Sequence, residues 1–370
     1  MSAMELIEAG VGITEVAERL GVSRQAIYDW KARYREDPEQ GLQDRSRRPN
    51  TSPTRTPDWV EQRVIEERKR WGFGSKKILR RLQDDDPAVV WPPRSTIDAI
   101  FARAGLTRRR ERPARRRFAP VEACQAPKAT AAGQVMTADF KGQFRLKNGR
   151  YCYPLLVADP VSRYLLACDG FVRISLEQTW STFVRVFREH GMPEMLHTDN
   201  GVPFGTSGHG RFSTISVRLM KYGIQPVYSR PGHPEDNGRH ERLNRTLMER
   251  TAIPPANDHE AQQVVFDAFR RTYNEERPHE SLQQDRPASR HCPSPRLFPE
   301  NEPLIEYPAH FEKHRVNPRG RMNWRGDRIY FSDAFANEHI GFEPIDSTTW
   351  RVHYGSFVIG RFTSADKRLV

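Results

Sequence analysis

Apolar residues near the N-terminus recur at helical spacing on both sides of one glycine. Val16 and Leu20 lie one helical turn apart before Gly21, and Ile27 and Trp30 follow it. Glycine readily adopts the left-handed backbone that ends a helix and turns the chain. The pattern therefore predicts two helices joined by a tight turn, the arrangement called helix-turn-helix.

The second of these helices is expected to begin after Ser23, whose hydroxyl suits a helix cap. Its polar face presents Arg24, Gln25, Tyr28 and Lys31. These side chains carry hydrogen-bond donors for base edges and phosphates, which a recognition helix in a DNA groove needs. An ordinary helical hairpin shows the same apolar pattern, so DNA binding and a purely structural role both stay open.

A second helical pattern covers residues 58–106 and predicts three helices. Its third helix is expected to open at Ser95 or Thr96. With Arg94, these residues are candidates for DNA contact, as in a winged or simple helix-turn-helix. A structural bundle is the alternative.

From residue 134 the pattern changes to strands and helices in alternation. Three β-rich runs are separated by the turns KNG and DPVS, which predicts consecutive antiparallel strands. Helical and strand-like segments then alternate, giving the order βββ-α-β-α-β-α. After residue 310, short alternating segments with Gly and Asp turns predict a small β-barrel.

We therefore expect a multidomain chain with helical N-terminal domains, an α/β core with a mixed sheet and a small C-terminal β-barrel. The expected boundaries are 1–36 for the first helix-turn-helix domain, 37–57 for a basic linker, 58–106 for the second helix-turn-helix domain, 107–133 for an Arg-rich linker, 134–290 for the α/β core and 310–370 for the barrel.

Charge sharpens this picture, because the 370 residues carry a net charge of +12 and nucleic acid becomes the leading partner. Residues 107–117 alone contain seven Arg and one Glu. Such a run does not pack in a core and is expected to contact phosphates, although nuclear targeting is a competing interpretation. The candidates in it are Arg108, Arg109, Arg110, Arg115, Arg116 and Arg117.

Other classes of protein are disfavoured. No stretch approaches the roughly 20 apolar residues that a membrane span needs. The N-terminus lacks the features of a secretory signal, so a cytoplasmic location is expected. The four cysteines are widely spaced without a CxxC pair, which favours neither a disulfide framework nor a zinc site.

Three acidic residues stand out by their expected positions. Asp139 lies within the first strand of the core, Asp199 at the end of the fourth, and Glu241 one turn into the last helix. Carboxylates gathered from strand ends and a facing helix would offer oxygen ligands to Mg²⁺. Two such ions can activate the attacking oxygen and stabilise the leaving oxygen of a phosphoryl displacement.

Residues beside these acids are candidates for supporting roles. Asn200 and Gly201 are expected to form the turn that aims Asp199, and His197 is either a strand residue or a hydrogen-bonding neighbour. Gly238 opens the segment that carries Glu241. On that helix the candidates for DNA contact are His240, Asn244 and Arg245.

At this point the chain resembles a family, the bacterial DDE-type insertion-sequence transposases, which share their catalytic core with retroviral integrases. The resemblance rests on TADFKG around Asp139, HTDNGVPF around Asp199, RPGHPEDNGRHERLNRTL around Glu241, and YNEERPHESL after the core. It implies an RNase H-like core in which Asp139, Asp199 and Glu241 are both the catalytic and the metal-binding triad.

The third acid has a competitor. Many relatives place 35 residues between the second Asp and the Glu, and Glu235 has that spacing, whereas 41 residues separate Asp199 from Glu241. We assign Glu241, because it lies inside the helix and has a fixed direction, while Glu235 follows Pro234 near the helix start. An acid at a helix start is well explained by the helix dipole alone.

The resemblance implies a transposase, a DDE polynucleotidyl transferase with two Mg²⁺ per site, for which Mn²⁺ is expected to substitute. It would bind the terminal inverted repeats of a mobile element in double-stranded DNA, cleave at the element ends and join the 3′-OH ends to target DNA. At least a dimer on nucleoid DNA is expected, because two ends must be joined. The alternatives are a DNA-binding regulator or domesticated transposase with a silent nuclease, and another RNase H-like nuclease.

Overall fold

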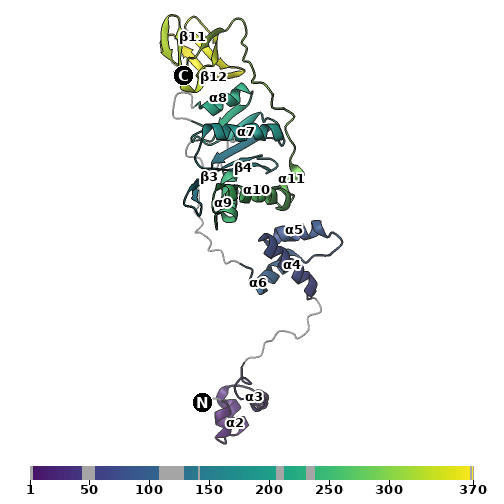
Figure 1. Ribbon diagram of the computed structural model, residues 1–370. Helices are drawn as coiled ribbons and strands as arrows, with labels where there is room; N and C mark the ends of the chain where they lie inside the picture. The colour runs from purple at the N-terminus through teal and green to yellow at the C-terminus, as the bar shows by residue number, and fades with distance from the viewer. Residues whose placement is uncertain are drawn as a thin grey trace. The chain divides into compact units, whose positions relative to one another are not determined.

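The computed structural model describes residues 3–43, 55–107, 129–140, 142–205, 212–230, 238–366 and 369, apart from the side chain of Arg239 (Figure 1). The chain divides into two compact units, residues 1–60 and 61–370, and each is described by itself. Within the described ranges, every helix is too short or too polar to cross a membrane.

The first unit contains the helices predicted around Gly21. They are α1 (Ala3–Glu8), α2 (Ile13–Leu20) and α3 (Arg24–Glu36). Gly21 has a φ of 65° and ends α2, while the Ser23 hydroxyl accepts a hydrogen bond from the Ala26 N–H and caps α3. Val16 and Ile27 are fully buried between the helices. The predicted helix–turn–helix geometry is therefore confirmed.

A second helical bundle follows, made of α4 (Asp58–Trp71), α5 (Ser75–Asp85) and α6 (Arg94–Arg103). The expected cap of α6 at Ser95 or Thr96 is wrong. The helix begins at Arg94, and Pro93 occupies the cap position without a side-chain hydrogen bond. Pro93 has the extended backbone of a residue that precedes a helix, and its ring offers no acceptor for the N–H groups of the first turn.

The core is built on a mixed sheet with the strand order β4-β3-β1-β5-β6. Its strands are β1 (Val135–Phe140), β3 (Tyr151–Ala158), β4 (Leu165–Phe171), β5 (Met195–Thr198) and β6 (Gln225–Tyr228). β3 is antiparallel to β1 and β4, whereas β1, β5 and β6 are parallel. The predicted order of elements is confirmed, with one addition, the two-residue strand β2 (Phe144–Arg145) beside the start of β3.

Helices cover both faces of this sheet (Figure 1). α7 (Leu176–His190) and α8 (Thr214–Lys221) pack on one face, and α9 (Gly238–Thr251) and α10 (His259–Arg271) on the other. Side chains alternate along β1, so Met136 and Ala138 join the α7 side. Asp139 consequently points to the side of α9.

The outer edge of β4 is closed by side chains from α10 and the π-helical turn η3 (Thr272–Glu276). Asn274 accepts a hydrogen bond from the Leu165 N–H at 2.8 Å and donates one to the Leu165 oxygen at 2.9 Å. Gln263 accepts from the Gly170 N–H and donates to the Cys168 oxygen. These amides take the place of a neighbouring strand. The short elements η4 (Glu280–Leu282) and α11 (Pro287–Arg290) follow.

Replacing Asn274 with Ala is expected to destabilise the core by about 2 kcal/mol or more, because it leaves a buried N–H and a buried carbonyl of Leu165 without partners. Glu275→Ala, at the exposed neighbouring position, is the matched control. Urea unfolding of the full chain measures both variants. Equal stability of the two would contradict this role of Asn274.

The C-terminal strands form two sheets around one aromatic core. β7 (Glu312–Arg315), β10 (His339–Pro344), β11 (Thr349–Tyr354) and β12 (Phe357–Thr363) make a four-stranded sheet, and β8 (Arg321–Trp324) pairs with β9 (Asp327–Tyr330). The turn η5 (Asp333–Phe335) lies between β9 and β10. Among the described strands the pairing is open, so the predicted closed barrel is not confirmed. Val217 and Met220 of α8 join this core and attach the domain to the sheet domain.

Candidate active site

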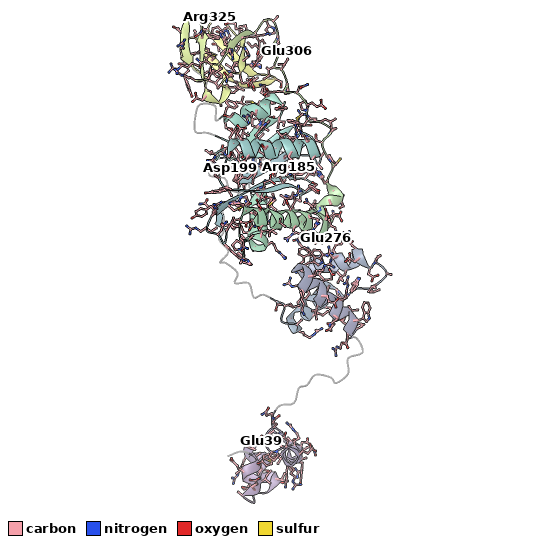
Figure 2. All side chains as sticks on the ribbon, in the orientation of Figure 1. Glu39, Arg185, Asp199, Glu276, Glu306 and Arg325 are labelled. Carbon is pink, nitrogen blue, oxygen red and sulfur yellow. The ribbon has the colours of Figure 1, made fainter. Side chains whose placement is uncertain are left out.

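Asp139 and Asp199 lie next to each other at the ends of two neighbouring strands. The parallel pairing of β1 and β5 sets Ala138 opposite Thr198; Asp139 is the next residue of β1, and Asp199 is the first residue after β5. Neighbouring strands are roughly 5 Å apart. Asp139 is buried and Asp199, labelled in Figure 2, is half-buried. The sheet therefore brings these two predicted carboxylates together.

α9 lies over Asp139 and is fixed there by apolar contacts and one polar contact. Leu243 and Leu247 are buried against the sheet, as the stripe of the helix predicts. Asn244 Nδ2 donates a hydrogen bond to Asp139 Oδ2 at 2.8 Å. Glu241 precedes Asn244 by three residues, a spacing that places the two on the same side of α9, with Glu241 one turn nearer the helix start. Unlike Asn244, Glu241 is exposed.

The loop after Asp199 orients the carboxylate of this residue by a main-chain hydrogen bond. The Gly201 N–H donates to Asp199 Oδ1 at 3.1 Å, and Asn200 Nδ2 donates to the main-chain oxygen of Ser229 just after β6. Burial raises the pKa of Asp199, and the Gly201 hydrogen bond opposes that rise. A carboxylate in such surroundings is stabilised by a nearby cation.

Replacing Gly201 with Ala is expected to displace the Asp199 carboxylate, because the new Cβ would lie 3.0 Å from Oδ2. DNA cleavage, the activity proposed below for this site, should then fall about tenfold or more, since small misplacements of a catalytic group are costly. The thermal unfolding midpoint should stay close to that of the parent chain. Gly142→Ala is the control, because a Cβ there meets no atom within 4 Å. Equal cleavage by the two variants would refute this role.

Two buried histidines lie beside the acids. His197 on β5 is 5% exposed, and its Nε2 lies 3.2 Å from the Ser229 hydroxyl. His240 is 4% exposed, and both its ring nitrogens are buried without a hydrogen-bond partner among the described residues. Burial, with a smaller contribution from His197, lowers the pKa of His240 to about 4. A neutral buried imidazole differs from the exposed phosphate-binding group that the sequence suggests.

Of the three neighbours of Glu241 expected to contact DNA, only Arg245 is exposed. Asn244 is 6% exposed and its amide is engaged with Asp139, so its observed role is to orient a carboxylate. The sequence does contain a sign of this role, because Asn244 follows Glu241 by three residues and such residues lie on the same side of a helix. Gly238 opens α9, and a Cβ there would meet open space.

The chemistry of the acids fits Mg²⁺, although the described residues do not form a ready-made cage. Mg²⁺ binds one or two carboxylates together with substrate oxygens and waters, so a full set of protein ligands is not required. Among the described side chains, no three His, Cys, Asp or Glu residues are grouped closely enough to hold a metal. Asp139 and Asp199 fit such a site as a pair of adjacent carboxylates, with Glu241 on the helix above.

The predicted recognition residues lie on the outer surface of their helices. Arg24, Gln25 and Tyr28 on α3 are exposed and Lys31 is half-buried, while Gln25 Nε2 donates to Asp29 Oδ1 at 3.0 Å. Their positions leave this face of α3 accessible to a groove of DNA.

On α6, Arg94 and Ser95 are exposed and Thr96 is half-buried. Arg94 lies 3.6 Å from Asp98, a surface ion pair that a phosphate can replace. The candidates Arg108, Arg109, Arg110, Arg115, Arg116 and Arg117, and the competing acid Glu235, lie outside the described residues.

Comparisons with known proteins agree with this architecture. Residues 129–234 and 222–287 match the family description Integrase core domain, and residues 2–50 match Helix-turn-helix domain. The integrase matches cover the strands and helices that carry Asp139, Asp199 and Glu241.

Solved structures with detectable similarity include viral integrases. One is the intasome of simian T-cell lymphotropic virus with the PP2A regulatory subunit B56 gamma, at 14% identity and a TM-score of 0.39, covering 80% of this chain and 97% of that chain. Another is the HTLV-2 integrase catalytic core domain with magnesium, at 16% identity and a TM-score of 0.31, covering 44% and 99%. The chain thus combines an N-terminal helix-turn-helix domain with an RNase H-like integrase core domain, which is consistent with a DDE transposase of an insertion sequence.

Proposed function

We propose that this chain is a Mg²⁺-dependent transposase that cleaves DNA at the ends of a mobile element and joins the freed 3′-OH ends to target DNA. The observation that carries the proposal is the register of β1 and β5, which sets Asp139 and Asp199 side by side under α9. The activity is that of a DDE polynucleotidyl transferase.

Asp139, Asp199 and Glu241 would hold the metal. Two bound Mg²⁺ ions, or Mn²⁺ in their place, would lower the barrier to attack of water or a 3′-OH on the phosphodiester. The amide of Asn244 keeps one Asp139 oxygen oriented, and the Gly201 N–H does the same for Asp199. Both contacts fix the carboxylates before DNA arrives, which preserves their alignment during the reaction.

DNA recognition would come from the N-terminal half of the chain. We propose the boundaries 1–36, 58–106, 134–290 and 310–370 for the two helix-turn-helix domains, the core and a small barrel-like domain. α3 and α6 would read base edges in the terminal repeats, and the Arg-rich linker 107–133 and the linker 37–57 would follow the phosphate backbone. Arg245 would contact phosphate beside the site. Pairing of two element ends requires at least a dimer on nucleoid DNA.

The test is strand cleavage and joining on oligonucleotides that carry the inverted repeats flanking the gene, with Mg²⁺ or Mn²⁺. The parent chain is expected to do both, and Asp199→Ala neither, while binding the repeats with unchanged affinity. Retained cleavage by Asp199→Ala would refute the mechanism. Repeat-specific binding by the parent chain without any metal-dependent cleavage would identify a DNA-binding regulator with a silent nuclease instead.

A further inference from the structure

One face of α5 in the second helical bundle carries charges that pair with residues 276–290, at the C-terminal end of the core. Three charged side chains at successive turns of α5 have partners of opposite sign in that segment. The pairs are Lys76 with Glu280 at 2.5 Å, Arg80 with Asp285 at 3.3 Å, and Asp84 with Arg286 at 3.4 Å. The charges of α5 change from positive to negative along the helix, and the charges of their partners change in the opposite sense. This pattern determines both the position and the direction of α5 on that segment.

Arg81 is the centre of this contact. Its Nη1 donates to Glu276 Oε2 at 2.6 Å and to the Glu276 main-chain oxygen at 2.8 Å, and its Nε donates to Glu67 Oε2 at 3.4 Å. The guanidinium also lies 4.3 Å from the ring centre of Trp71. Arg81 is 4% exposed and Glu67 1% exposed, whereas the Glu276 side chain is partly exposed. Glu276, labelled in Figure 2, completes its set of partners from the core side.

An aromatic side chain adds to the contact. Phe73, in the turn between α4 and α5, is 4% exposed and lies under the guanidinium groups of Arg250 and Arg277, at 5.7 and 5.6 Å from the ring centre. Arg250 Nη2 also donates to the Gly72 oxygen at 3.3 Å. Cations above a ring face are attracted to it. Burial, and then the nearby Arg277, lower the pKa of Lys77 to about 7, which reduces the repulsion among these cations.

We propose that residues 272–290, which contain the YNEERPHESL motif, form a docking surface for the second helical bundle of the same chain. The ion pairs of Lys76, Arg80 and Asp84 are at least partly exposed and therefore individually weak, so a short tether between the two surfaces favours contact within one chain. Only 21 residues separate Thr107 from Ala129, and a tether of this length raises the local concentration to roughly the millimolar range. If the bundle docks on the core of its own chain, α6 and the candidate active site of one subunit are held in a fixed relative position.

Carbodiimide cross-linking tests the docking without DNA. The reagent joins an amine and a carboxylate that already form an ion pair, so Lys76 and Glu280 of the full chain are expected to become linked. Peptide mass spectrometry of the monomer band on a denaturing gel should contain the linked pair, and Glu280→Gln should remove it. Absence of the link, or a link found only in the dimer band, would overturn the proposal.

A second experiment tests the consequence for catalysis and rests on the proposed function. Glu276→Lys/Glu280→Lys places cations opposite Arg81 and Lys76, and is expected to lower cleavage at element ends at least tenfold. Glu260→Lys/Glu300→Lys makes the same charge change at exposed positions without a described ion pair and should cleave like the parent chain. Equal cleavage by the two double variants would show that docking does not couple DNA recognition to DNA cleavage. If the parent chain itself fails to cleave, the cross-link still decides whether docking occurs.

Discussion

Glu241→Gln is expected to abolish metal-dependent cleavage, by about a thousandfold or more, whereas Glu235→Gln should leave the rate within a few-fold of the parent chain. The physical reason is that Glu241 shares a stripe of α9 with Asn244, whose amide is bonded to Asp139. With Glu241 as the proposed third metal ligand, its loss would remove stabilisation of the charge that develops in the transition state. Single-turnover cleavage of labelled terminal-repeat DNA measures both variants.

The comparison is informative because the two substitutions are chemically identical and lie six positions apart. Binding of the repeats by gel shift should be unchanged in both, which separates catalysis from recognition. If Glu235→Gln were the inactive variant, the assignment of the third acid would be wrong and the 35-residue spacing would be the better guide.

Arg81→Met is expected to destabilise the second helical bundle by on the order of 3 kcal/mol. Without the guanidinium, the buried Glu67 keeps, among the described residues, the ion pair with Arg63 at 3.5 Å, whose side chain is half-exposed. Breaking a buried pair leaves an uncompensated charge. Hydrogen exchange of the α4 and α5 amides measures the effect locally, because loss of protection there does not depend on unfolding of the sheet.

Arg80→Met is the matched control, since that side chain is partly exposed and its ion pairs are of the kind worth about 1 kcal/mol or less. Removing both buried charges, in Arg81→Met/Glu67→Met, should restore most of the lost protection, because two apolar side chains can pack where an ion pair was. Equal protection in Arg81→Met and Arg80→Met would disprove the central position of Arg81.

Local patterns predicted the architecture well where one element carries the signal. Gly21 and Ser23 act within one turn, and the buried stripe of Leu243 and Leu247 on α9 follows from helical period alone. The pairing of Asp139 with Asp199 also followed from motifs at strand ends. Each of these features depends on interactions between residues that are near in sequence or on strand order.

Features that depend on the rotation of packed elements were not predictable in this way. Asn244 and His240 were expected on an exposed face of α9, but both are buried where the helix meets the sheet. The contact between Arg81 and Glu276 joins residues 195 positions apart, and the sequence around either residue does not indicate that the two meet. The C-terminal strands were expected from alternation, but alternation does not determine whether a sheet closes.

The side chains of α10 and η3 that close the outer edge of β4 have a consequence for how copies of this chain associate. An unprotected edge strand offers its N–H and carbonyl groups to a strand from another molecule, which promotes aggregation. Along β4 those groups are occupied by Gln263, Arg270 and Asn274. The sheet is therefore closed to strand addition at the β4 edge even at high local concentration, such as that of several copies gathered on one DNA molecule.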